Sequence, residues 1–228
     1  MRVTWRTEAP QWILIAGMFL LALVSWARVP DQVPVHWSAA GQVDRYGSKG
    51  EGLLLLPALT VGVYVLLLLI PRIDPGRANY TRFAGVYSVI RIAVVTTLAG
   101  LYGVLYLLYS GRHVDIGTLA GLLTGGLCVI LGELMPKIRP NWFVGIRTPW
   151  TLSSKLAWAK THRLGGWLFI AAGLAMMAAG LAHTGWAARV VLDALVGIVV
   201  WSFIYSYLVW RTDPQKILPA GTSPAETE

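Results

Sequence analysis

Residues 140–163 read PNWFVGIRTPWTLSSKLAWAKTHR and form the longest polar interval in the second half of the chain. The interval contains basic side chains, hydroxyls, an amide and three tryptophans, but no aspartate or glutamate. The runs on either side are apolar, and each is about as long as the 20 residues that a helix needs to cross a bilayer. Because tryptophan and basic residues are enriched at the cytoplasmic surface of membranes, the interval predicts an inner loop between two membrane spans.

The composition of the whole chain supports an integral membrane protein. Of its 228 residues, 56% are hydrophobic and only 13% are charged, whereas about 25% are charged in a soluble domain. The net charge of +8 comes from basic residues in short loops beside apolar runs. With no basic face on a soluble domain, we expect no direct nucleic-acid binding. The single cysteine, Cys128, leaves no disulfide within the chain.

Six apolar runs predict an all-α, polytopic membrane protein with six transmembrane helices. The runs cover about residues 12–29, 52–70, 92–109, 117–135, 164–181 and 187–210. In the fourth run, the spacing of Gly121, Gly125 and Gly132 favours close helix packing. We expect one integral membrane domain over residues 1–228, in which residues 211–228 form a disordered tail.

The distribution of lysine and arginine orients these helices. If the amino terminus lies inside, 14 of the 19 basic residues fall in inner segments and five in outer ones. Since positive loops stay inside, both termini are predicted to be cytoplasmic. The loop of residues 30–51 then faces outside, and the loop of residues 136–163 faces inside. Arg91, at the start of the third run, is expected to extend its charged end to the membrane interface, and Tyr102 and Tyr109 are expected in an aromatic belt.

The inner loop offers a group of polar side chains. We expect a turn around Gly145 and then a short helix to Arg163, capped by Thr151 or Ser153, with Trp158 at the membrane interface. An arginine beside hydroxyls and an amide suits a carboxylate or a phosphate. The candidate binding residues are Asn141, Gly145, Arg147, Thr148, Trp150, Thr161, His162 and Arg163. The alternative is that the loop only anchors and orients the fold.

Glu133 is the most costly residue of the fourth run, and an acid in a span is a functional candidate by default. Because it lies within a turn of Pro136, it can also reach the inner surface. There it would pair with Arg147 or Arg163 and fix the inner loop to the helix.

The outer loop, rich in proline and glycine, predicts a folded loop or short turns. Its candidate binding residues are His36, Trp37, Asp44 and Lys49. His36 and Asp44 offer nitrogen and oxygen ligands, as would His183 on the same side, but their spacing matches no metal motif, so whether metal binds stays open. The alternative is a loop packed over the helix ends, with Trp37 at the interface.

Both loops resemble known family signatures. PNWFVGIRTPWTL at residues 140–152, followed by Trp158 and by Thr161-His162-Arg163, closely resembles the signature of the SdpI family of bacterial membrane proteins. VPVHW at residues 33–37, followed by Asp44 and Lys49, resembles the companion domain of unknown function that often precedes it. The resemblance covers an N-terminal two-helix unit at about 10–70 and an SdpI-like unit at about 117–185.

This resemblance implies an inner-membrane protein that gives immunity to a secreted, membrane-active peptide toxin. It implies a toxin contact on the outer side and capture of a transcriptional repressor on the inner side, besides the lipid bilayer itself. Three alternatives remain: a small transporter lined by Glu133 and Arg91, a membrane enzyme using His36, Asp44 or His162, and a stress protein that alters membrane order. No catalytic motif stands in the chain, so we expect neither an enzyme nor a cofactor.

Overall fold

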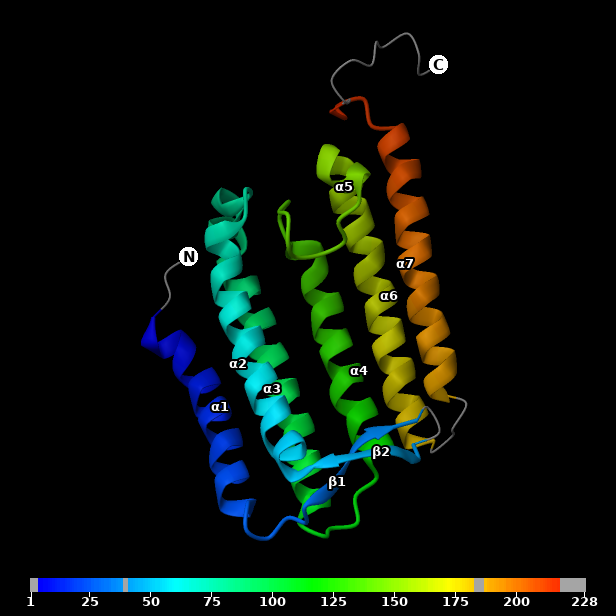
Figure 1. The fold of residues 1–228 in the computed structure, drawn as a ribbon. Coiled ribbons are helices and arrows are strands. Elements are labelled where there is room, and N and C mark those ends of the chain that lie inside the picture. Colours follow the sequence, from blue (N-terminus) through cyan, green and yellow to red (C-terminus); the bar gives the residue numbers. More distant parts are fainter. Residues whose placement is uncertain (1–3, 39–40, 183–186, 218–228) are drawn as a thin grey trace.

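The computed structural model describes residues 4–38, 41–182 and 187–217. Within them, six helices are long and apolar enough to cross a membrane, which confirms the prediction of a helical, six-span protein. The elements are α1 (Trp5–Ser25), β1 (Gln32–Trp37), β2 (Val43–Ser48), α2 (Lys49–Ile73), η1 (Arg77–Phe83), α3 (Ala84–Tyr109), α4 (Ile116–Leu134), η2 (Met135–Lys137), α5 (Pro149–Ser153), α6 (Lys155–Leu181) and α7 (Ala187–Arg211). The long helices stand side by side, with the β-hairpin at one end and α5 at the other (Figure 1).

Two helices begin well before their apolar runs. α1 begins at Trp5 rather than near residue 12, and α3 begins at Ala84 rather than near residue 92. The charged residues that interrupted these runs, Glu8 and Arg91, are both buried and face each other between the helices. The expectation that Arg91 extends to the interface is therefore wrong.

α2 continues through two prolines that lie inside it, Pro57 and Pro71, although we expected it to end at residue 70. A proline cannot donate the helical hydrogen bond to the carbonyl four residues earlier. The carbonyl four residues before Pro57 accepts the hydroxyl of Tyr102 at 3.1 Å, and the one before Pro71 accepts the hydroxyl of Tyr87 at 2.6 Å. Tyrosines of α3 thus satisfy the carbonyls that the prolines leave free, and they join the two helices.

The same bonds correct the predicted aromatic belt. Tyr102 and Tyr109 are buried rather than at an interface, and the hydroxyl of Tyr109 donates to the carbonyl of Pro34 at 2.8 Å. Tyr109 thereby ties α3 to the hairpin, where it packs in a core cluster with Val33 and Leu53.

The outer loop is an antiparallel β-hairpin rather than a set of turns. β1 pairs with β2 in a register that places Val33 opposite Gly47, and these two positions are buried. The remaining positions of β2 are exposed. Ser48 ends the hairpin and caps α2, since its hydroxyl accepts the backbone N–H of Glu51 at 3.2 Å. The hairpin therefore lies over one end of the bundle and connects α1 to α2.

α4 and α6 pack closely through glycines, as the spacing in the fourth run predicted. A Cβ atom at Gly125 would lie 2.6 Å from the carbonyl oxygen of Gly173, and one at Gly132 would lie 2.6 Å from that of Gly166. Neither position has room for a larger residue, so the two backbones meet directly.

The segment that follows α7 is partly ordered. The backbone N–H of Ile217 donates to the carbonyl of Ser153 at 2.9 Å, and Asp213 is buried. The prediction of a disordered tail therefore does not hold for residues 211–217. Residues 218–228 and His183 lie outside the described residues.

Candidate functional site

The motif loop, residues 138–154, is held together by its own side chains. The side-chain oxygen of Asn141 accepts the N–H groups of Phe143 and Val144 at 3.0 and 2.6 Å. Its amide nitrogen donates to the carbonyls of Arg139 and Val144 at 2.9 and 3.0 Å. All of its polar atoms are thus used within the loop, so Asn141 shapes the backbone rather than offering a free amide to a ligand.

His162 has the same inward role. It is buried, its Nε2 accepts the N–H of Ile146 at 3.1 Å, and its Nδ1 lies 2.8 Å from the carbonyl of Trp158. A carbonyl only accepts, so Nδ1 carries the proton and the ring is a neutral imidazole. Gly145 lies against this ring with φ +102°, and a Cβ there would collide with it.

Trp158 is buried and not at the membrane interface, which corrects our expectation. Its ring stacks on His162 with centroids 4.0 Å apart, and its Nε1 donates to the carbonyl of Ile138 at 2.9 Å. Thr161 is also buried, and its hydroxyl has no hydrogen-bond partner within the described residues. These side chains fill the space beneath the motif loop.

The hydroxyls of the loop cap two helices. Thr148 caps α5 by accepting the N–H of Thr151 at 3.1 Å, and Ser154 caps α6 by accepting the N–H of Ala157 at 2.9 Å. The predicted caps, Thr151 and Ser153, are therefore wrong. Thr148 also contacts the hydroxyl of Ser206 on α7 at 2.9 Å.

Trp150 packs against α7 as well. Its ring lies 4.7 Å from that of Phe203 and 5.1 Å from that of Tyr207, measured between centroids. Trp150 and Thr148 are therefore engaged within the protein, and neither offers the free surface that the sequence suggested.

Two buried aspartates hold the motif loop from opposite ends of the chain. Asp74, at the end of α2, accepts the hydroxyl of Tyr80 at 2.8 Å and the N–H of Trp142 at 3.0 Å. Asp213, just after α7, accepts the hydroxyl of Ser154. Sequence reasoning missed both. The one signal for Asp74 is the Asp-Pro-Gly turn that it begins.

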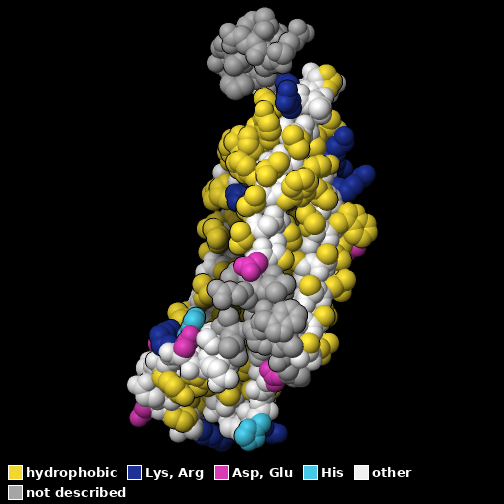
Figure 2. Space-filling view, turned by 90° about the vertical axis from the view of Figure 1, so that its right-hand side faces the viewer, with side chains coloured by type: hydrophobic (Ala, Val, Ile, Leu, Met, Phe, Trp, Pro, Cys, Tyr) yellow, Lys and Arg dark blue, Asp and Glu magenta, His cyan; other side chains and the backbone are white. Residues whose placement is uncertain are grey.

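The outward-facing part of the motif loop is small. Trp142 and Phe143 are 54% and 38% exposed, and Arg147 is exposed beside them, donating from Nη1 to the carbonyl of Trp142 at 2.8 Å. Exposed cations surround this tip at the same end of the bundle: Arg72, Arg77, Arg82, Lys137, Arg139, Lys155, Lys160, Arg163 and Arg211. On the face shown in Figure 2, the upper end carries blue side chains and no magenta ones.

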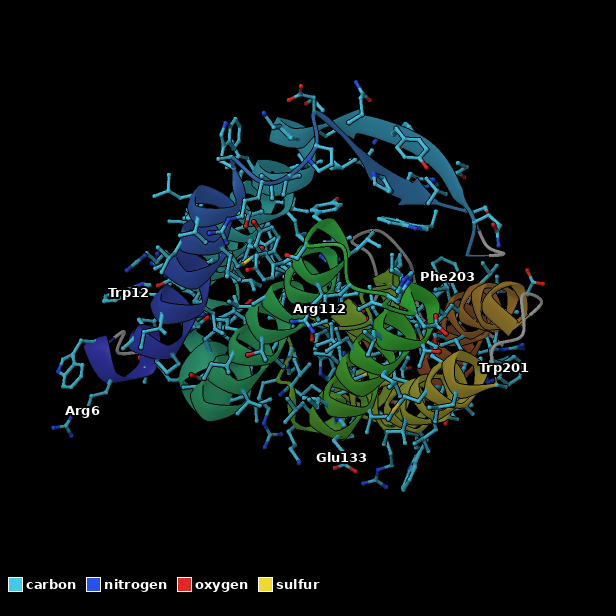
Figure 3. All side chains as sticks on the ribbon, turned by 90° about the horizontal axis from the view of Figure 1, so that it is seen from below. Arg6, Trp12, Arg112, Glu133, Trp201 and Phe203 are labelled. Atoms are coloured by element: carbon cyan, nitrogen blue, oxygen red, sulfur yellow. The ribbon has the colours of Figure 1, made fainter. Side chains whose placement is uncertain are left out.

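Glu133 does not join this group. Its side chain is 63% exposed and lies 4.0 Å from Lys137, not beside Arg147 or Arg163. Figure 3 shows Glu133 at the outer edge of the bundle. The predicted pairing of Glu133 with the loop is wrong, and so is its place beside Arg91 along a polar path.

The outer candidates lie together on the hairpin. Nδ1 of His36 lies 2.6 Å from Asp44, and Lys49 pairs with Asp31 at 2.7 Å. His36 and Asp44 are exposed, and Lys49 is partly exposed. The hydrogen bond and charge of Lys49 hold the pKa of Asp31 below its ordinary value. Trp37 is half-buried. Within the described residues, no three His, Cys, Asp or Glu side chains form a group that could hold a metal ion.

A buried charge pair inside the bundle was missed entirely. Arg91 of α3 and Glu8 of α1 are 0% and 1% exposed, and they form an ion pair. The carboxylate also accepts the hydroxyl of Tyr64 at 3.0 Å and the amide of Gln11 at 3.3 Å. Trp12 donates to Tyr64 at 2.6 Å from the outer side of α1 (Figure 3). The pair escaped sequence reasoning because residue 8 was placed outside the first span.

Comparison with known proteins divides the chain into two matched segments. Residues 137–207 match the SdpI/YfhL protein family, and residues 13–61 match DUF1648, a domain of unknown function. The chain is 22% identical over 161 residues to "Immunity protein SdpI" of Bacillus subtilis, covering 71% of this chain and 75% of that protein. It is 38% identical over 61 residues to an uncharacterized protein of Archaeoglobus fulgidus, 27% of this chain and 33% of that protein. No solved structure gives a significant match.

Proposed function

Because this multi-pass bacterial membrane protein matches the SdpI/YfhL protein family over residues 137–207 and DUF1648 over residues 13–61, we propose that it gives immunity to a membrane-active peptide toxin. The observation that carries the proposal is the match to an immunity protein over 71% of this chain.

The hairpin is the surface we propose for toxin contact. Most of β2 is exposed, including Tyr46 at 61%, and His36 and Asp44 lie at its surface. If the positive end of the bundle faces the cytoplasm, the hairpin lies at the outer face of the cytoplasmic membrane, where a secreted peptide arrives.

The tip of the motif loop is the surface we propose for an inner partner, such as a repressor. Trp142, Phe143 and Arg147 offer two apolar rings beside a guanidinium, a combination enriched in protein interfaces. The surrounding cations favour a partner with an acidic face. Thr148 and Trp150 do not belong to this surface, because their side chains contact α7 within the protein.

The test is survival of a toxin-sensitive bacterium that expresses the protein, with matched amounts in the membrane. The wild type should protect, and His36→Ala should reduce protection if the hairpin contacts the toxin. Arg147→Ala should abolish capture of the inner partner, while Lys160→Ala, which removes another exposed cation nearby, should not. A wild-type protein that gives no protection against SdpI-type toxin would refute the proposal for that toxin.

A further inference from the structure

The Glu8–Arg91 pair is unusual because it is buried in a bundle with few charges. Removing two charges from water costs several kcal/mol per ion, so a buried pair is weak evidence for stability and better evidence for fixing one arrangement. Glu8 lies in the first turn of α1, and Arg91 lies in the first third of α3. The pair therefore sits toward the end of the bundle that carries the motif loop.

α1 has few other attachments to the bundle. Its large apolar side chains mostly face outward, among them Ile13 at 70% and Leu23 at 73% exposure. Met18 and Ala22 pack in the core cluster at the hairpin end. At the other end, the inward-facing side chains are Glu8 and Gln11. Polar contacts thus determine where this end of α1 lies.

Arg91 depends on Glu8 for its compensation. Within the described residues, Nε and Nη1 of Arg91 and the side-chain oxygen of Gln11 have no hydrogen-bond partner. Among the described residues, the guanidinium makes a hydrogen bond only through Nη2, which donates to the carboxylate of Glu8. If the carboxylate were lost, the buried charge of Arg91 would be uncompensated, and α3 would have to shift or admit water.

A set of buried contacts leads from the start of α3, one turn before Arg91, to the motif loop. Tyr87 occupies this position and donates to a carbonyl of α2 at 2.6 Å. Its ring lies edge-on to Tyr80, with centroids 5.2 Å apart. The hydroxyl of Tyr80 donates to Asp74 and lies 3.3 Å from the side-chain oxygen of Asn141. A shift at the start of α3 would therefore disturb the residue that shapes the loop.

We propose that the Glu8–Arg91 pair is a latch that couples the position of α1 to the conformation of the motif loop. With the pair closed, Tyr87 and Tyr80 hold Asp74 and Asn141 in place, and the loop is rigid. When Glu8 loses its charge, the buried guanidinium of Arg91 is left uncompensated, the start of α3 shifts and the loop loosens. This coupling does not depend on the proposed immunity function.

The test follows the reactivity of a cysteine at the loop tip. Phe143→Cys is placed in a Cys128→Ala background, and its labelling by a maleimide is timed in the purified full chain in detergent micelles. Glu8→Gln should change the labelling rate by about 2- to 30-fold, the range that measured coupling energies give. Met18→Ala weakens α1 at the hairpin end and should leave the rate as it is.

A double variant separates the latch from general damage. Glu8→Gln with Arg91→Gln removes both charges, so no buried charge is left unpaired, and the rate should return toward that of the background protein. Should Glu8→Gln not accumulate in the membrane, Glu8→Asp replaces it, because it keeps the charge on a shorter side chain. Its change in labelling rate should still be larger than that of Met18→Ala. Equal rates in the single Glu8 variants and the background, or an equal change in Met18→Ala, would overturn the proposal.

Discussion

At the scale of single residues, the conspicuous polar side chains of residues 140–163 serve the loop's own structure. Asn141 and His162 bind backbone groups of the loop, and Thr148 caps a helix. The sequence indicates that such residues matter, because polar groups are scarce in this chain. It does not indicate whether they face a ligand or the backbone, since that depends on the direction in which the loop folds. Among the candidate side chains of this interval, Arg147 and Arg163 are the ones that are exposed and can meet a partner.

The charge of Asp213 should make the stability of the protein depend on pH. The hydroxyl of Ser154 and then the N–H of Gln215 lower the pKa of Asp213 from its ordinary value of 3.8. A lowered pKa in the folded state means that the carboxylate stabilises the fold above about pH 4, and that this contribution is lost as pH falls through the folded-state pKa. Thermal unfolding in micelles should therefore show that Asp213→Asn is less stable than the wild type at pH 7.

The difference between the two proteins should shrink below pH 4, where the wild-type carboxylate takes up its proton. A difference that stays constant from pH 7 to about pH 3 would show that the charge of Asp213 is not what holds Ser154. Asp31, whose pKa is lowered by Lys49 at the hairpin, provides a comparison site at the other end of the bundle.

At the scale of elements, the apolar runs predicted the number of spanning helices and the glycine contacts between α4 and α6, but not the helix ends. The ends depend on whether a charged residue finds a buried partner, as Glu8 and Arg91 do. That pairing joins residues far apart in the chain, so no local pattern reveals it. The prolines of α2 are similar: their tolerance depends on Tyr87 and Tyr102 from the next helix.

Replacing Tyr102 by phenylalanine tests this support of α2. The variant removes the hydroxyl that donates to the carbonyl of Leu53, four residues before Pro57, and a buried group left without a partner costs about 1–3 kcal/mol. Thermal or denaturant unfolding should therefore show a loss of this size. Tyr106→Phe removes a hydroxyl from the same helix that makes no such bond to α2, so it should have little effect. Equal losses in both variants would contradict the role of Tyr102.

At the scale of the whole molecule, the motif loop is held by residues that lie far from it in the chain. Asp74 holds it from the N-terminal side and Asp213 from the C-terminal side. The sequence shows two separate signatures, and it cannot show that the motif loop is held by aspartates that belong to neither quoted motif. The hairpin could not be predicted from the sequence either. Its buried positions, Val33 and Gly47, form only a short alternating pattern among proline and glycine residues that are typical of turns.

The orientation of the bundle is the last prediction. Most of the lysines and arginines gather at the end with the motif loop, whereas the hairpin end carries fewer, among them Arg28, Arg45, Lys49 and Arg112. Since loops with an excess of lysine and arginine stay in the cytoplasm, the hairpin should face outside. In intact cells, a membrane-impermeant maleimide should label Tyr46→Cys at once but Phe143→Cys only after permeabilisation, both in a Cys128→Ala background. The opposite pattern would reverse the orientation, and it would place the hairpin on the wrong side of the membrane to meet a secreted peptide.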